Sequence, residues 1–187
     1  VALIANIVLA RILTPYEFGQ VGIVMFFIII SKVFTESGLS GAIIRKKDAT
    51  PTDYSTVFIF NLIISLVLVV VLFFAAEPIA HFYNDIELKD IIRVSSAVLI
   101  IYAFQITHIT KLVQQLQFRK KAIYEFIAIL ISAITAITFA YKGFGVWAIV
   151  LMQILTASIL SLILWMFEEW PTVFVFSTGS FMKLYNF

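Results

Sequence analysis

The chain has 187 residues, of which 62% are hydrophobic and only 13% are charged, whereas soluble domains have about 25% charged residues. This composition excludes a soluble globular domain and predicts an integral membrane protein of the all-α class. The formal net charge of +2 does not support nucleic-acid binding, and the absence of cysteine excludes disulfides, thiolate metal sites and cysteine nucleophiles.

Six apolar segments follow one another along the chain. Five of them are long enough to cross a hydrocarbon core of about 30 Å, which takes roughly 20 residues in a helix. The first is shorter and begins at Val1 without a methionine, so we expect a piece of a longer protein with a truncated first helix. The prediction is a polytopic bundle of six transmembrane helices, at residues 1–13, 15–37, 52–76, 89–114, 122–141 and 145–167.

Two short motifs predict helix starts, and two predict helix ends. In TPYE (14–17) and TPTD (50–53), the threonine can accept a hydrogen bond from a helical N–H, and the proline needs no partner in the first turn. The acid in each motif lies near the positive end of the helix. Glu-Pro at 77–78 is expected to end the third segment, and YKGFG (141–145) is expected to turn between the fifth and sixth.

The distribution of basic residues predicts the orientation in the membrane. The link between the second and third segments holds Arg45, Lys46 and Lys47, the link between the fourth and fifth holds four more, and Lys183 follows the sixth. Lys32 lies within a span, and the links on the opposite side hold the remaining four of the thirteen Lys and Arg residues. Because basic residues favour the cytoplasm, the richer side is predicted to be cytoplasmic.

Two other patterns predict how the fifth and sixth helices lie. Small residues at four-residue steps on the fifth segment predict close packing against a neighbouring helix. They are Ala128, Ser132, Ala136 and Ala140. Trp147 and Trp165 bracket the sixth segment and are expected only as interfacial anchors.

The stretch FFIIISKVFTES (26–37) places a charged pair, Lys32 and Glu36, inside the second segment. Lys32 lies about 21 Å along the helix from Phe18 at the expected outer boundary. An unpaired lysine at mid-bilayer costs about 2.5–3.5 kcal/mol on insertion scales, so it needs an explanation. Either its stem reaches toward the headgroups while Glu36 partly neutralises it, or it faces a watery cavity and binds an anion.

The fourth segment carries a second group of polar residues, Gln105, His108 and Lys111, with Gln115 close by. Spacings of three residues suggest a polar, cationic stripe that should turn toward protein or water. We expect this stripe to meet Lys32 at one depth on the cytoplasmic side and to suit the capture of an anionic headgroup. The alternative for His108 is a hydrogen-bonded packing residue.

The stretch LARILTPYEFGQVGI (9–23) resembles the junction of the first two helices in bacterial polysaccharide flippases. These proteins form a branch of the multidrug/oligosaccharidyl-lipid/polysaccharide exporter superfamily. Further similar stretches follow in the same order and cover essentially the whole chain. They are SGLSGAIIRKKDATPTDYSTVFIFNL (37–62), LFFAAEPIAHFYND (72–85), GFGVWAIVLMQIL (143–155) and WPTVFVFS (170–177).

The resemblance implies that the chain is one half of a two-bundle transporter in the bacterial inner membrane. Residues 1–170 would form the N-terminal bundle, and 171–187 a cytoplasmic interfacial segment leading to a second bundle. The implied activity is transfer of an undecaprenyl-pyrophosphate-linked oligosaccharide to the outer leaflet for surface polysaccharide synthesis. Arg11 and Arg45 lie in matching motifs, and relatives line their cavity with basic residues. The expected partners are the lipid-linked oligosaccharide, membrane lipids, the second bundle and a polysaccharide polymerase.

The tail after residue 170 is not expected to span the membrane. Residues 180–187 can form a short amphipathic helical turn, with Ser180 as its cap and with Phe181, Leu184 and Tyr185 on one side. We expect this helix to lie at the inner surface, with Lys183 exposed.

Other functions are less well supported by the sequence. It contains no P-loop, no G-x-S-x-G, no H-E-x-x-H and no paired-carboxylate site, and His81 and His108 are too few for a usual zinc site. We therefore predict no enzyme, no metal and no cofactor. A drug and cation antiporter should have acids in its cavity, whereas Glu36 is the one acid expected clearly inside a span. A non-transporting scaffold of a polysaccharide-synthesis complex would not need the cationic stripe.

Overall fold

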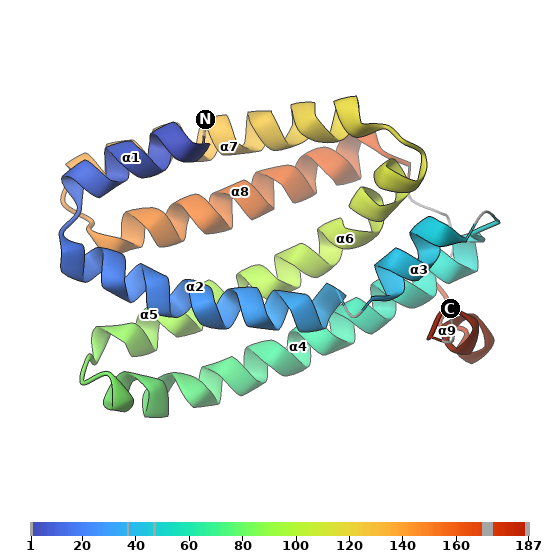
Figure 1. Ribbon diagram of the computed structural model, residues 1–187, viewed down its shortest axis with the longest axis horizontal. Helices are drawn as coiled ribbons and strands as arrows, with labels where there is room; N and C mark the ends of the chain where they lie inside the picture. Colours follow the sequence, from blue (N-terminus) through green and yellow to red (C-terminus); the bar gives the residue numbers. More distant parts are fainter. Residues whose placement is uncertain (1, 37, 47, 170–173, 186–187) are drawn as a thin grey trace.

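In the computed structural model, the described residues are 2–36, 38–46, 48–169 and 174–185, and their regular secondary structure is α-helical. Figure 1 shows the long helices running along a common bundle. The helices are α1 (Ala2–Ile12), α2 (Pro15–Glu36), α3 (Leu39–Arg45), α4 (Pro51–Phe82), α5 (Glu87–Ser96), α6 (Val98–Gln114), α7 (Phe118–Tyr141), α8 (Val146–Phe167) and α9 (Thr178–Tyr185).

Five helical stretches are long and apolar enough to cross a membrane. They correspond to five of the six predicted spans, whereas the first predicted span is a shorter apolar helix, Leu3–Ile12. That helix packs beside α7, where Leu9 is fully buried. The prediction of an all-helical membrane bundle is therefore confirmed, with five full-length candidate spans. They are Pro15–Thr35, Pro51–Phe82, Glu87–Gln114, Phe118–Tyr141 and Val146–Phe167.

The third predicted span is longer than expected, because Glu-Pro does not end it. Pro78 lies inside α4, which continues to Phe82. A proline within a helix leaves the carbonyl four residues earlier, here that of Phe74, without its usual N–H donor. Arg93 of α5 supports this part of α4, since its Nε donates to the neighbouring carbonyl of Phe73 at 3.3 Å. Helix α4 thus continues past a proline that was expected to end it, and a contact from another helix lies beside this turn.

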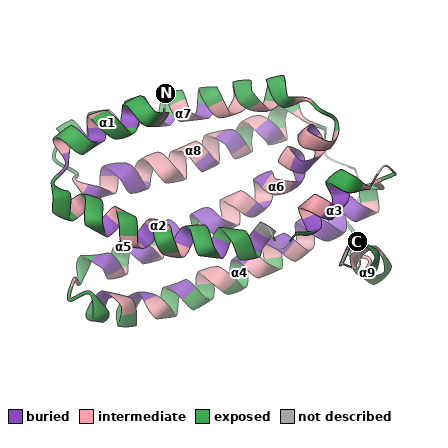
Figure 2. Ribbon diagram, viewed as in Figure 1, coloured by how far each residue is buried: buried purple, intermediate pink, exposed green. Residues whose placement is uncertain are grey.

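The fourth predicted span consists of two helices, α5 and α6, which meet at Ala97. Ser96 lies at this break and its hydroxyl donates to the carbonyl of Arg93 at 2.7 Å, a bond that competes with regular helix geometry. In the most apolar window of this span 56% of the residues are buried, against 22% to 33% in the other four. Figure 2 shows the same contrast, so the α5–α6 span is the central element of the bundle.

The helix connections gather at the two ends of the bundle (Figure 1). We call the end with Thr14, residues 83–86 and residues 142–145 the turn end. The other end, with α3, the α6–α7 link and α9, is the junction end. The predicted orientation assumes that the helix connections are divided between the two ends in this way. The assignment of the junction end to the cytoplasm stays a prediction.

Both predicted helix starts are confirmed as reciprocal caps. At the start of α2, the Glu17 N–H donates to Thr14 Oγ1 at 3.3 Å, and the Thr14 N–H donates to Glu17 Oε2 at 2.7 Å. At the start of α4, Thr50 and Asp53 form the same arrangement. Gly145 in the α7–α8 turn has a φ of +54°, a conformation that favours glycine, and a β-carbon there would also force the Glu17 carboxylate to shift.

A second polar contact at the turn end joins α2 to the α4–α5 connection. The buried Gln20 amide donates to Asp85 Oδ2 at 2.8 Å and to Glu87 Oε2 at 3.2 Å. Burial alone would raise the pKa of the Asp85 carboxyl, but hydrogen bonds from Tyr16 and Gln20 outweigh it and hold the pKa below its usual value. These bonds hold the start of α2 against the connection between α4 and α5.

The small-residue face of α7 packs closely on its neighbour α8, as predicted. Its four members are at most 4% exposed, and the Ser132 hydroxyl lies 2.5 Å from that of Thr156 on α8. Small side chains allow two helix backbones to approach, and a shared hydroxyl pair adds a hydrogen bond across them.

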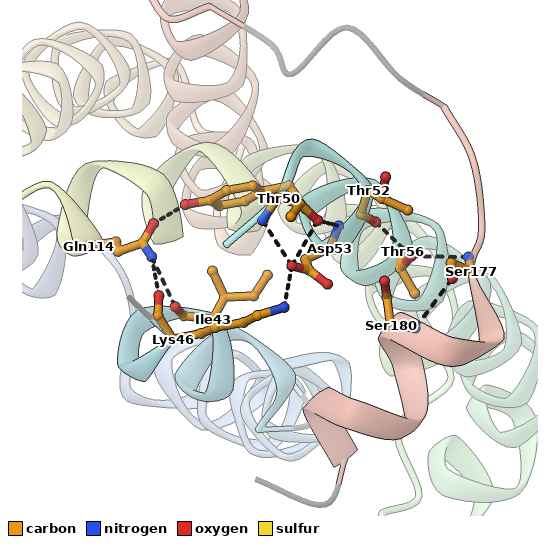
Figure 3. Close-up of polar contacts among 10 residues, drawn as sticks. Ile43, Lys46, Thr50, Thr52, Asp53, Thr56, Gln114, Ser177 and Ser180 are labelled. Atoms are coloured by element: carbon orange, nitrogen blue, oxygen red, sulfur yellow. Dashed lines mark hydrogen bonds and ion pairs between the residues drawn. The ribbon is translucent and has the colours of Figure 1, made fainter. Parts of the chain in front are cut away.

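The tail begins its helix earlier than expected, and its cap is Ser177 rather than Ser180. The Ser180 N–H donates to Ser177 Oγ at 3.3 Å, so α9 starts at Thr178. Just before it, the Ser177 N–H donates to Thr56 Oγ1 of α4 at 3.1 Å (Figure 3). The sequence pattern had placed the hydroxyl cap one turn too late.

The apolar side of α9 is buried against α3 and α4, since Leu184 is 3% exposed and lies in one cluster with Ile43 and Val57. Lys183 is exposed, as predicted. The predicted boundary between residues 170 and 171 lies outside the described residues.

Gln114, at the end of α6, joins three helices at the junction end (Figure 3). Its amide nitrogen donates to the carbonyls of Ile43 and Lys46 at 3.1 and 2.8 Å, and its amide oxygen accepts from the Tyr54 hydroxyl. The last carbonyls of a helix lack donors within that helix. Gln114 therefore caps α3 and holds it to α4 and α6.

The orientation is tested with single cysteines, for which the natural chain provides a cysteine-free background. We expect Lys142→Cys at the turn end to react with a membrane-impermeant maleimide in intact spheroplasts. Asp48→Cys and Arg119→Cys, both exposed at the junction end, should react only after permeabilisation. The reverse labelling pattern would contradict the orientation.

The role of Gln114 is tested by Gln114→Leu, which leaves the two α3 carbonyls without these donors. The expected cost is about 1–3 kcal/mol, the usual penalty for a buried polar group that loses its partner. It should appear as a lower melting temperature of the purified protein in detergent and as faster proteolysis between residues 38 and 50. Gln115→Leu, a neighbouring exposed position, is the matched control, and equal melting temperatures of the two variants would refute the role.

Candidate functional site

A cleft of about 250 Å³ opens among three helices in the half of the bundle nearer the junction end. The central helix α6 contributes the most lining residues, and α2 and α7 contribute the charged ones. We call it the α2–α6–α7 cleft. Its lining consists of Lys32 and Thr35 from α2, Tyr102, Gln105, Ile106 and Ile109 from α6, and Lys121 and Glu125 from α7.

Lys32 lies at this cleft, in contact with the face of an aromatic ring. Its Nζ is 4.8 Å from the centroid of the Tyr102 ring, a distance typical of a cation–π contact. This contact places the Lys32 ammonium group beside α6. Glu36 is the last residue of α2, and its side chain lies outside the described part, so the Lys32–Glu36 pair stays a prediction.

Sequence reasoning missed an ion pair that shares the cleft. Lys121 Nζ lies 2.6 Å from Glu125 Oε1, one turn further along α7. By the predicted spans, Lys121 belongs only to the link between the fourth and fifth segments. Glu125 lies within the predicted fifth span, so Glu36 is not the one acid inside a span, and that argument was wrong. The signal that could have found the pair is opposite charges at i and i+4 at the start of an apolar helix.

The polar residues of α6 do not all face the cleft. Each three-residue step turns an α-helix about 60° short of a full circle, so Gln105 and Lys111 differ by about 120° in direction. Gln105 lines the cleft and donates to the carbonyl of Ala157 on α8. His108 is 2% exposed, and its ring lies 4.9 Å from that of Trp165. Lys111 donates to the carbonyl of Glu169 at 2.8 Å.

The expected grouping of His108 and Lys111 with Lys32 is therefore not what the structure shows. Both residues contact α8 or the chain just after it, and the described lining of the cleft does not include them. The position of His108 fits the packing alternative. Only Gln105 of the predicted stripe shares the cleft with Lys32.

Trp165 has a larger structural role than that of an interfacial anchor. Its indole N–H donates to the carbonyl of Phe104 at 3.0 Å, and its ring packs against Phe58 as well as His108. The expectation that it acts only as an anchor was wrong, because the residue joins α8 to α6 inside the bundle.

The two arginines in the family-like motifs lie at opposite ends of the bundle. Arg11 is in the last turn of α1 at the turn end, and Arg45 is in the last turn of α3 at the junction end. Both are exposed, and neither is part of the described cleft lining. A role in substrate binding for either residue stays a prediction.

The charged residues in the described lining of the cleft are two lysines, Lys32 from α2 and Lys121 from α7, and one acid, Glu125. Tyr102 and Gln105 of α6 also line it. Such a site can bind an anion through charge-assisted hydrogen bonds. Among the described residues, no three His, Asp or Glu side chains come together in a way that could hold a metal ion.

Comparison with known families agrees with the motifs of the sequence. The family model described as polysaccharide biosynthesis protein matches residues 8–187. The chain belongs to this family. It is a multi-pass bacterial membrane protein of the group that includes polysaccharide flippases. No solved structure matches it significantly.

Its curated relatives act in the synthesis of several surface polysaccharides. The succinoglycan biosynthesis transport protein ExoT of Rhizobium meliloti is 28% identical over 96% of the chain, which covers 36% of that relative. The teichuronic acid biosynthesis protein TuaB of Bacillus subtilis is 23% identical over 85% of the chain and 33% of its own length. The lipopolysaccharide biosynthesis protein WzxC of Escherichia coli is 23% identical over 68% of the chain and 26% of its own length. The chain thus spans about a third of the relatives that it matches.

Proposed function

We propose that the chain is the N-terminal bundle of a flippase that moves an undecaprenyl-pyrophosphate-linked oligosaccharide to the outer leaflet of the bacterial inner membrane. The observation that carries the proposal is the α2–α6–α7 cleft, which offers lysines from two helices within a chain of the polysaccharide biosynthesis family. In this proposal residues 1–170 form the bundle, and 171–187 lead to a second one. The protein binds and moves its substrate without changing it chemically.

The physical problem of such transport fits a cationic cleft. A pyrophosphate with several sugars cannot cross hydrocarbon, because its charges and hydroxyls would lose their water. A polar cleft that is open to lipid at its side lets the headgroup pass while the isoprenoid tail stays in the bilayer. Rocking of two bundles around a fixed site then gives alternating access. A membrane potential that is negative inside favours outward movement of negative charge, by about 2.3 kcal/mol per charge per 100 mV.

Two rival functions make different demands on the same residues. A cation antiporter needs an acid that can take up cations, and Glu125 is an acid in the cleft, but Lys121 already pairs with it. A scaffold protein needs no charged cleft at all. The presence of lysines from two helices in the described lining supports an anionic substrate over both.

The proposal predicts that Lys32→Met in the full-length protein blocks export. The substitution keeps the apolar stem and removes one charge-assisted contact to the headgroup, a loss that usually amounts to roughly a 10- to 100-fold effect. We expect normal insertion, a matching loss of surface polysaccharide and accumulation of lipid-linked precursor in the cytoplasmic leaflet. The measurements are immunoblots of the membrane, quantification of surface glycan and extraction of lipid-linked intermediates.

Two further variants sharpen this experiment. Lys32→Arg should retain part of the export, and Lys142→Met, an exposed lysine at the turn end, should leave it unchanged. Normal export by Lys32→Met would mean that Lys32 only reaches toward headgroups and that the site is wrong. Loss of cation extrusion in Glu125→Gln, with glycan export intact, would favour the antiporter instead.

A further inference from the structure

We propose that Lys121 is a second anion ligand of the α2–α6–α7 cleft and that Glu125 is its displaceable counter-ion. A phosphate group of the substrate would bind by taking the place of the Glu125 carboxylate beside Lys121. This inference rests on the proposed function and adds two residues, with opposite effects on affinity, to the same site.

The geometry of the pair suits such an exchange. The two side chains are 2.6 Å apart, and both line the cleft that also holds Lys32. The side chain of Lys121 is 30% exposed and that of Glu125 is 37% exposed, so solvent and ligand can reach both groups. A partly exposed pair at i and i+4 is weak, because water screens it and two long side chains must be ordered.

The other ion pairs described at the junction end are built differently. Lys120, the neighbour of Lys121, lies 3.3 Å from Glu168, whose side chain is only 9% exposed and also accepts from the Tyr124 hydroxyl at 2.9 Å. In the pair of Lys46 with Asp53, the aspartate side chain is 2% exposed. In both of these pairs the acid is buried and fixed by further hydrogen bonds. Glu125 stands out because its carboxylate is accessible.

The position of Lys121 also weakens its bond to Glu125. Lys121 lies in the first turn of α7, which contains Arg119 and Lys120 but no acid. The positive end of a helix disfavours cations in its first turn, and a lysine that precedes its glutamate by four residues is the less favourable order. The positive helix end therefore favours an incoming anion beside Lys121 but does not favour the lysine itself.

A phosphate group is a stronger partner for Lys121 than a carboxylate, because it carries more charge and more acceptor oxygens. An anion in contact with both Lys32 and Lys121 would link α2 to α7, the two helices that supply the charged lining. On release, Glu125 would return to Lys121 and compete with the leaving group. Competition from Glu125 thus lowers the affinity of the cleft for the phosphate group, which allows the substrate to be released.

The test measures binding by the purified full-length protein in nanodiscs of uncharged phosphatidylcholine. The probe is farnesyl pyrophosphate, with inorganic pyrophosphate and farnesol as comparison arms, and Kd is measured by isothermal titration calorimetry. We expect Lys121→Met to weaken farnesyl pyrophosphate binding roughly tenfold and Glu125→Gln to tighten it severalfold. Lys120→Met, which breaks the neighbouring pair outside the cleft, is the matched control and should leave Kd unchanged.

The opposite sign of the two effects is the result that supports the inference, since a purely structural pair would not produce it. If both variants melt at lower temperature but bind like the wild type, Lys121 and Glu125 only support α7 and the inference is wrong. If Lys32→Met weakens binding and these two variants do not, the proposed site stands and this inference alone fails. If the wild type binds neither pyrophosphate probe, both fail. Equal affinity for inorganic and farnesyl pyrophosphate would support the site but assign it to the free anion.

Discussion

A polar group inside a bilayer has to find its hydrogen-bond partner within the protein, and this constraint determines how the central helix is rotated. Gln105 of α6 donates to the Ala157 carbonyl of α8, and Trp165 of α8 donates to the Phe104 carbonyl of α6. Rotating α6 would leave these groups unpaired in a medium that cannot solvate them. In this rotation α6 lines the cleft with Tyr102, Gln105 and Ile109.

The features that sequence predicted correctly are local ones. The caps of α2 and α4 are each complete within four residues, and the spacing of Ala128, Ser132, Ala136 and Ala140 holds along one helix face. The charge of Lys32 within an apolar run identified one member of the cleft for the same reason. What these patterns could not give is the identity of the neighbour, because periodicity fixes a direction around one helix and not the element that lies there.

The predictions that were wrong involve contacts across the fold. Pro78 should end α4 by local rules, but Arg93 from α5 lies against the affected turn. Lys111 was placed with Lys32, whereas a carbonyl beyond α8 is its partner. Glu125 could have been found, since its pairing with Lys121 is local, but its place in the cleft depends on how α7 lies beside α6. Each of these positions requires knowledge of helix packing that a single sequence does not contain.

In the proposed function, a rocking transporter would need both a well-connected end of the bundle and a site that can release its ligand. At the junction end Gln114 joins α3, α4 and α6, and the segment before α9 is hydrogen-bonded to Ser55 and Thr56 of α4. The cleft needs the opposite property, because a ligand that binds too tightly cannot be released. In our proposal, the partly exposed ion pair of Lys121 and Glu125 would provide that property.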